Sequence, residues 1–226
     1  MSSSWSNGRI LGSELQFPSP HTALRGEYDG LVAMGGDLSL PRLLLAYRSG
    51  IFPWSVDPIT WWSPDPRAVF DLDRLHIGRT VSKILKRQTF TITRDTAFQQ
   101  VMRECAKPAP GRVETWVSEE FIQAYSALHR SGHAHSLECW EEGKLVGGIY
   151  GVQIGGFFAG ESMFHRVSNA SKVAVYSLLE HLNDRGFLLF DTQVLNPTTE
   201  QLGAYNIPRE TYLRRLQIAL AKPCVY

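Results

Sequence analysis

Two carboxylates and an amide stand in the sequence where packing alone does not explain them. Glu161 follows the apolar run FFAG, and Asp191 follows the run FLLF, with Gln193 two residues further on. Sheets commonly open to bind ligands where neighbouring strands end. We therefore expect these three side chains to lie together at the ends of two adjacent strands. The alternative is that Glu161 caps a helix and Asp191 forms a turn.

The elements that must position these side chains alternate along the second part of the chain. Period-2 and β-branched or aromatic runs predict strands, and apolar residues at helical spacing predict helices. Antiparallel hairpins followed by a helix and a further strand predict the α+β class with a mixed, largely antiparallel sheet. The predicted strands cover residues 69–72, 90–95, 135–140, 144–154, 156–162 and 187–194. The predicted helices cover residues 79–87, 96–105, 118–130 and 170–185.

The first part of the chain differs in character. Pro and Gly interrupt it repeatedly in FPSP, GIFPWS and WWSPDPR, and one short helix is predicted from Ser39 to Tyr47, with Ser39 as N-cap and Pro41 in the first turn. Because longer periodic elements begin after WWSPDPR, we expect a small N-terminal α+β domain over 1–66 and a larger catalytic domain over 67–226.

Composition excludes several classes of protein. The 226 residues are 43% hydrophobic and 20% charged, with a net charge of +1, which is ordinary for a soluble globular chain. No apolar run approaches the ~20 residues that cross a bilayer, and no secretory signal begins the chain, so we expect a cytoplasmic protein. Three widely spaced cysteines favour neither a disulfide framework nor a cysteine-based metal site. The patterns GxGxxG, GxxxxGK[ST] and GxSxG are absent.

One helix carries a one-sided positive charge. In RTVSKILKR, the residues Arg79, Lys83 and Lys86 fall at helical positions i, i+4 and i+7, with Arg87 beside them and no acid between. Such a stripe can follow a phosphate backbone. It can equally be a solvated helix face whose charges pair with acids elsewhere.

Tryptophans provide a second possible contact with nucleic acid. Trp54, Trp61 and Trp62 cluster in the Pro-rich first part, and Trp116 precedes the helix that starts near Ser118. Loop tryptophans usually pack in small cores, but they can also stack on a base, which contributes ~1–3 kcal/mol. Together with the basic helix and the carboxylates, they favour an enzyme that acts on a nucleotide-bearing or RNA-borne substrate.

Long ordered motifs then identify a family. In chain order they are GLVAMGGDLS, GIFPWS, WWSPDPR, GHAHSLE, LVGGIYGV, GESMF, NASKVA, FDTQVLN and LGAYNIPR. From about residue 15 to 216 the sequence resembles the bacterial leucyl/phenylalanyl-tRNA–protein transferases. The resemblance implies a GNAT-like acyltransferase domain behind a smaller domain. It also implies transfer of Leu or Phe, less often Met, from aminoacyl-tRNA to an N-terminal Arg or Lys, which marks the acceptor protein for degradation by the N-end rule pathway.

The resemblance also assigns roles to residues. Asp191 and Gln193 correspond to the pair proposed to orient and deprotonate the attacking amine, with Asp191 polarising Gln193. Glu161 corresponds to the acid that holds the basic acceptor residue, and whether it also handles the proton stays open. The pocket for the transferred side chain maps to Ile149, Phe158, Met163 and Val175. The tRNA contacts map to Trp54 and Trp116, beside the terminal adenosine, and to Arg79, Lys83, Lys86 and Arg87, beside the acceptor stem.

The chemistry so implied needs no metal and no cofactor, because an aminoacyl ester is already activated and the amine attacks it directly. A monomer acting on aminoacyl-tRNA and acceptor proteins is expected.

Two alternative functions remain. A CoA-dependent GNAT enzyme would carry a Gly-rich pyrophosphate turn, but the equivalent stretch HRVSNASK contains no glycine. A non-catalytic tRNA-binding module would leave Glu161, Asp191 and Gln193 without a purpose.

Overall fold

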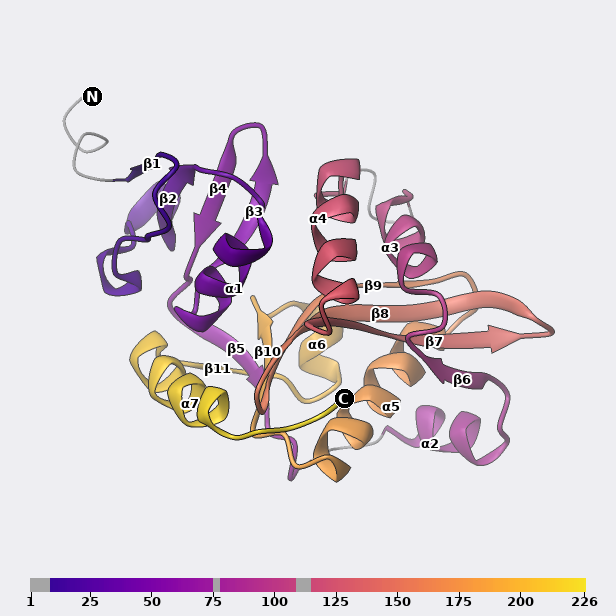
Figure 1. The fold of residues 1–226 in the computed structure, drawn as a ribbon. Coiled ribbons are helices and arrows are strands. Elements are labelled where there is room, and N and C mark those ends of the chain that lie inside the picture. The colour runs from indigo at the N-terminus through magenta and orange to yellow at the C-terminus, as the bar shows by residue number, and fades with distance from the viewer. Residues whose placement is uncertain (1–8, 75–77, 109–114) are drawn as a thin grey trace.

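The computed structural model describes residues 9–74, 78–108 and 115–226. The first part of the chain forms a four-stranded sheet in the order β1-β2-β4-β3 (Figure 1). Its strands are β1 (Ile10–Leu11), β2 (Leu31–Gly35), β3 (Phe52–Val56) and β4 (Ile59–Trp62). Helix α1 (Leu40–Arg48) packs beside this sheet, and two short 3-10 helices cover Pro20–Thr22 and Gly26–Tyr28. The chain leaves this sheet at Trp62 and enters the second sheet at Arg67.

The second sheet has seven strands in the order β11-β5-β10-β9-β8-β7-β6. Only the β9·β10 pair is parallel, so the sheet is mixed and largely antiparallel. The strands are β5 (Arg67–Phe70), β6 (Thr91–Arg94), β7 (Ala134–Glu141), β8 (Lys144–Ile154), β9 (Phe157–His165), β10 (Leu189–Gln193) and β11 (Tyr205–Ile207).

Helices cover both faces of this second sheet. In Figure 1, α3 (Phe98–Ala106) and α4 (Glu119–Arg130) lie over one face, and α5 (Ala170–Asp184) lies across the other with α2 (Arg79–Lys86) beside it. The short α6 (Pro197–Gln201) and the final α7 (Arg209–Ala221) follow β10 and β11. Buried side chains of α5, among them Val173, Leu178 and Leu182, supply the core on its side.

The predicted α+β class is confirmed, and each predicted helix is present with ends displaced by at most two residues. One strand prediction is wrong. Glu161 does not end its strand, because β9 continues to His165 and pairs with β8 over that whole length. The sequence interpretation also left the elements after Val194 unassigned, where α6, β11 and α7 lie.

None of the helices in the described ranges combines the length and the apolar character that a membrane span requires.

Candidate active site

Two irregularities in neighbouring strands create the site. In β9 the pairing with β8 shifts register between Gly160 and Ser162, so that Glu161 is the extra residue of a β-bulge. In β10 the pairing with β5 shifts between Asp191 and Gln193. The parallel pairing of the two strands stops at Ala159 and Asp191. Bulges re-aim side chains and end strand pairing, so β9 and β10 separate at this point. Neither carboxylate stands at the end of its strand, where the sequence predicts it.

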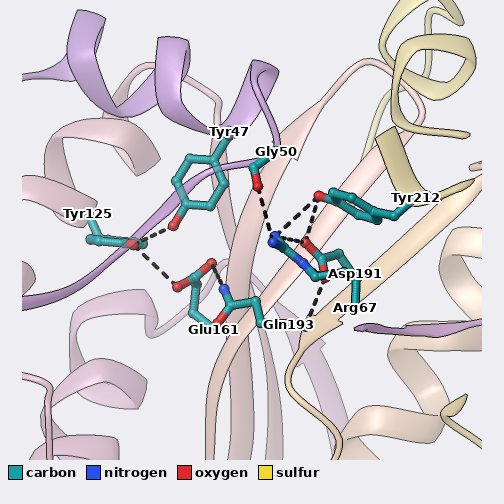
Figure 2. Close-up of polar contacts among 8 residues, drawn as sticks. All are labelled: Tyr47, Gly50, Arg67, Tyr125, Glu161, Asp191, Gln193 and Tyr212. Carbon is teal, nitrogen blue, oxygen red and sulfur yellow. Dashed lines mark hydrogen bonds and ion pairs between the residues drawn. The ribbon is translucent and has the colours of Figure 1, made fainter. Parts of the chain in front are cut away.

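Glu161 and Gln193 meet across this opening (Figure 2). The Nε2 of Gln193 donates to Oε1 of Glu161 over 2.9 Å, and the hydroxyl of Tyr125 donates to Oε2 over 3.3 Å. The Tyr125 hydroxyl in turn is hydrogen-bonded to that of Tyr47. The acid is thus joined to β10, α4 and α1, and the last of these belongs to the first part of the chain.

The environment of Glu161 makes ionisation costly. Burial among apolar neighbours raises its pKa from 4.5 to about 7, and the negative charge of Asp191 acts in the same direction. Hydrogen bonds from Tyr47, Gln193 and Tyr125 lower the pKa but only partly offset burial. Desolvation and Glu161 itself hold the pKa of both tyrosine hydroxyls well above the ordinary value, so these hydroxyls stay protonated and can donate. Perturbed acids of this kind cluster at functional sites.

Asp191 lies deeper than Gln193 and does not contact its side chain. Its carboxylate forms an ion pair with Arg67 at 2.7 Å, and both side chains are buried. Its Oδ1 accepts the backbone N–H of Gln193 over 2.8 Å. The expected polarisation of the Gln193 amide by Asp191 therefore has no direct contact in the structure; the amide donates to Glu161 instead.

A cavity of about 300 Å³ opens beside Glu161. This lies at the lower end of the range for small-molecule pockets. Its apolar lining residues are Phe70, Ile149, Met163, Val175 and Phe190. Its polar lining residues include Glu161, Ser162, Thr192, Asn196 and Thr198.

Three of the four residues predicted for a side-chain pocket line this cavity, namely Ile149, Met163 and Val175. The fourth, Phe158, does not. It is fully buried and stacks on Phe190, with ring centroids 5.6 Å apart, so it supports the cavity wall from behind. Phe158 lies on the same face of the sheet as Ile149 and Met163 and belongs to the same core cluster, but it pairs with Gln153, further along β8 from Ile149. Its position along the strand therefore keeps it out of the cavity lining.

A second, larger cavity of about 580 Å³ lies on the other side of the segment after β10. Thr192 and Asn196 face the first cavity, whereas Val194 and Leu195 line the second. Trp54 also lines it, is 43% exposed and packs edge-on against Trp62 at 5.6 Å. A half-exposed indole beside an open cavity is available for stacking.

The remaining predicted contacts lie apart from these cavities. Trp116 lines neither of them and packs edge-on against Phe121 at 5.0 Å. The predicted basic helix forms as α2, and its four cationic side chains are all exposed. Those residues are Arg79, Lys83, Lys86 and Arg87.

Within the described residues, no group of three or more His, Cys, Asp and Glu side chains is arranged to hold a metal ion.

Sequence reasoning missed four side chains at the site. Tyr47 was named only as the end of a predicted helix, and Tyr125, Arg67 and Tyr212 were given no role at the site. A usable signal existed for the tyrosines, because a tyrosine rather than a phenylalanine on a core-facing position needs a partner for its hydroxyl. Arg67 pairs with a residue 124 positions away, which no local pattern reveals.

Comparison with known sequences decides the family. Residues 69–217 match the family described as leucyl/phenylalanyl-tRNA protein transferase, and residues 36–65 match the N-terminal domain of the same transferase. The chain belongs to the leucyl/phenylalanyl-tRNA–protein transferase family. A leucyl/phenylalanyl-tRNA–protein transferase of Shewanella pealeana is 53% identical over 202 residues, which cover 88% of this chain and 85% of that protein. One of Shewanella putrefaciens is 52% identical with the same coverage. The chain is therefore an aminoacyltransferase.

Among solved structures, the transferase is similar to a GCN5-related N-acetyltransferase-like protein from Streptococcus suis. The TM-score is 0.36 at 15% sequence identity, and the match covers 70% of this chain and 59% of that one.

Proposed function

We propose that this aminoacyltransferase moves Leu or Phe, less often Met, from aminoacyl-tRNA to the N-terminal Arg or Lys of an acceptor protein. The new peptide bond would create a degradation signal for the N-end rule pathway. The observation that carries this proposal is the juxtaposition at Glu161. A carboxylate that accepts two hydrogen bonds lines a cavity whose lining also includes five apolar side chains.

The apolar lining residues suit the transferred side chain. Met163 is unbranched and flexible, so it can adapt to either a branched aliphatic or an aromatic group. Phe70 and Phe190 pack edge-on against each other at 5.4 Å and offer a rigid surface. The polar lining residues Ser162, Thr192 and Asn196 suit the ester carbonyl and the free amino group of the aminoacyl moiety.

Glu161 suits the cationic head of the acceptor residue. Without a cationic partner, burial disfavours the ionised form of the Glu161 carboxyl. A bound guanidinium or ammonium group would stabilise that ionised form. An acceptor that begins with an uncharged residue would leave the acid without this partner. The site therefore supports selection of Arg or Lys over neutral residues.

The reaction needs positioning and one proton transfer. The acceptor α-amine, with an ordinary pKa of ~8, attacks the ester carbonyl carbon, and the bond to the terminal ribose oxygen breaks. The amine proton ends on the departing ribose oxygen. Either the neighbouring ribose hydroxyl or a protein side chain relays it. Gln193 is near enough to Glu161 to orient the incoming amine.

The nucleic acid would approach from the second cavity. The segment 192–196 separates the two cavities, so an ester at its edge could place the amino-acid side chain on one side and the terminal adenosine against Trp54 on the other. Trp116 would contact the same end of the tRNA, and the exposed cations of α2 would hold the acceptor stem. We further propose that the enzyme works as a monomer in the cytoplasm, with no cofactor.

The test offers the purified protein leucyl-tRNA labelled in the amino acid and two peptides that differ only in an N-terminal Arg or Ala. Label should move selectively to the Arg peptide. Tight tRNA binding without label transfer would favour a binding module, and acyl transfer that requires acetyl-CoA would favour the CoA-dependent alternative. Either result would overturn the proposal.

A further inference from the structure

A buried polar cluster lies beside Gln193, on the side away from Glu161 (Figure 2). Arg67 on β5 donates to both oxygens of Asp191, from Nε over 2.9 Å and from Nη2 over 2.7 Å. The Tyr212 hydroxyl on α7 donates to Oδ2 of Asp191 over 2.9 Å. None of the three residues is more than 1% exposed.

The Asp191 carboxylate has no capacity left for a substrate. Its Oδ1 accepts from Arg67 and from the Gln193 backbone N–H, and its Oδ2 accepts from Arg67 and Tyr212. A carboxylate offers about four lone-pair positions in all. Because these are filled and the side chain is fully buried, Asp191 is not placed to receive a proton from the acceptor amine.

A further part of the chain, the turn after α1, anchors the cluster. Arg67 donates from Nη1 to the carbonyl of Gly50 over 3.1 Å, just after α1. Gly50 has a φ of +75°, and a Cβ there would stand 2.5 Å from Leu213 of α7. Glycine adopts this conformation without strain, and a larger residue here would also require Leu213 to move. The Arg67 guanidinium also lies over the ring of Tyr212, at 4.4 Å from its centroid.

The cluster acts on the site through one backbone bond. Gln193 has a φ of +65°, in the left-handed region that residues other than glycine adopt uncommonly. The Asp191 carboxylate accepts the N–H of this residue and so holds it in that conformation. In that conformation the Gln193 side chain reaches Glu161.

We propose that Arg67 and Tyr212 are positioning residues, which act through the Asp191 carboxylate to hold Gln193 against Glu161. The inference rests on the proposed function and refines it, because it makes Asp191 part of the support of the site. The amine proton then leaves by way of the ribose hydroxyl or Glu161.

A matched pair of variants separates this role from simple stability. Tyr212→Phe removes only the hydroxyl that binds Asp191. Tyr205→Phe removes a hydroxyl from a similar Arg–Asp–Tyr cluster, in which Tyr205 donates to Asp71 over 2.6 Å and accepts from Arg215. Tyr205 lies on β11 and contacts neither Gln193 nor Glu161. Tyr212→Phe should lower the thermal stability more, because its cluster is fully buried whereas Asp71 and Arg215 are partly exposed. The kinetics are therefore compared at a temperature at which both variants are folded.

Transfer kinetics should distinguish them. We expect Tyr212→Phe to lower kcat for the Arg peptide roughly five- to tenfold with little change in KM for aminoacyl-tRNA, while Tyr205→Phe keeps wild-type kcat. In a Gln193→Ala background, Tyr212→Phe should have no further effect, because its route to the site is already removed. Equal losses in both backgrounds, or no loss in either, would overturn the proposal.

Two further measurements complete the test. Asp191→Asn keeps an oxygen that can accept the Gln193 N–H, so it should retain more activity than Asp191→Ala. Equal, complete loss in both folded variants would favour a proton-accepting Asp191.

Independently of activity, a ¹³C NMR titration follows the Glu161 carboxyl. Loss of the Gln193 donor should raise its pKa in Gln193→Ala and in Tyr212→Phe, but not in Tyr205→Phe. This readout stands even if the protein proves inactive in transfer, and an unchanged Glu161 titration in Tyr212→Phe would contradict the inference alone.

Discussion

The Gln193 amide donates to the Glu161 carboxylate over 2.9 Å, across two strands that have just stopped pairing. Each residue stands at a register shift of its own strand. Two local defects in the sheet thus bring an acid and an amide together beside a cavity. The acid is buried enough that its pKa rises to about 7, which places its charge change within the working range of the cell.

The first prediction concerns the pH dependence of transfer. If ionised Glu161 holds the cationic acceptor, kcat/KM for an Arg peptide should fall as pH drops through about 7, because Glu161 becomes protonated. In Glu161→Gln this inflection should disappear and overall activity should be low. The inflection of the acceptor α-amine at ~8 should persist in both proteins, which provides an internal control. Identical profiles would contradict the role of Glu161.

The second prediction concerns stability and follows from the same shift. The pKa of Glu161 is raised on folding, from 4.5 to about 7. The folded protein therefore binds more protons than the unfolded chain between these values, so its stability decreases as pH rises through that window. Glu161→Gln removes a partly buried charge and should raise Tm by about 2–4 °C near pH 8. At pH ~4.5 the difference should vanish, since the wild-type acid is then protonated.

Glu104 offers a control of opposite sign for this measurement. Although burial alone would raise its pKa, hydrogen bonds and charge from Lys107 and Arg166 lower it below the ordinary value. The ionised Glu104 carboxylate therefore stabilises the fold at pH values above the ordinary pKa of glutamate. Glu104→Gln should accordingly lower Tm at neutral pH. A Glu161→Gln variant that also loses stability near pH 8 would show that the acid is not strained in the folded state.

The sequence predicts the elements of this fold better than the contacts of the site. Apolar periodicity sufficed for α4 and α5, and the two acids were expected together because each follows a buried run. The bulge at Glu161 was not predicted. The sequence indicates only a strand over 156–162, because the pairing with β8 that continues this strand to His165 is a tertiary contact. The Arg67–Asp191 pair depends on the tertiary order of β5 and β10, which local propensity does not encode.

The third prediction concerns the choice of amino acid. Met163→Ala removes side-chain volume from the apolar lining of the cavity of about 300 Å³ beside Glu161. The larger space should favour the aromatic group, so the ratio of kcat/KM for phenylalanyl-tRNA over leucyl-tRNA should rise roughly tenfold. Val152→Ala, which truncates a buried residue of the neighbouring strand β8 outside the cavity lining, should leave the ratio unchanged. A ratio that moves equally in both variants would indicate general loosening of the core.

The fourth prediction concerns α2. The exposed cations Lys83 and Lys86 stand one turn apart on a helix that packs beside α5. If they contact tRNA phosphates, reversing both to Glu should weaken tRNA binding most at low salt. The slope of log K against log salt should fall by ~0.7–0.9 for each lost contact. Catalysis at saturating aminoacyl-tRNA should be nearly unchanged, because no residue of α2 lines the cavity beside Glu161 or the larger cavity beside Trp54.

The control for α2 must change net charge equally without touching that helix. Arg48 at the end of α1 and Arg214 on α7 are both exposed, and both helices lie on the side of the molecule away from α2 (Figure 1). Reversal of these two residues gives the same net charge as the α2 variant. If the two double variants lose affinity equally, long-range charge explains the effect. Only a larger loss of slope in the α2 variant supports direct phosphate contact.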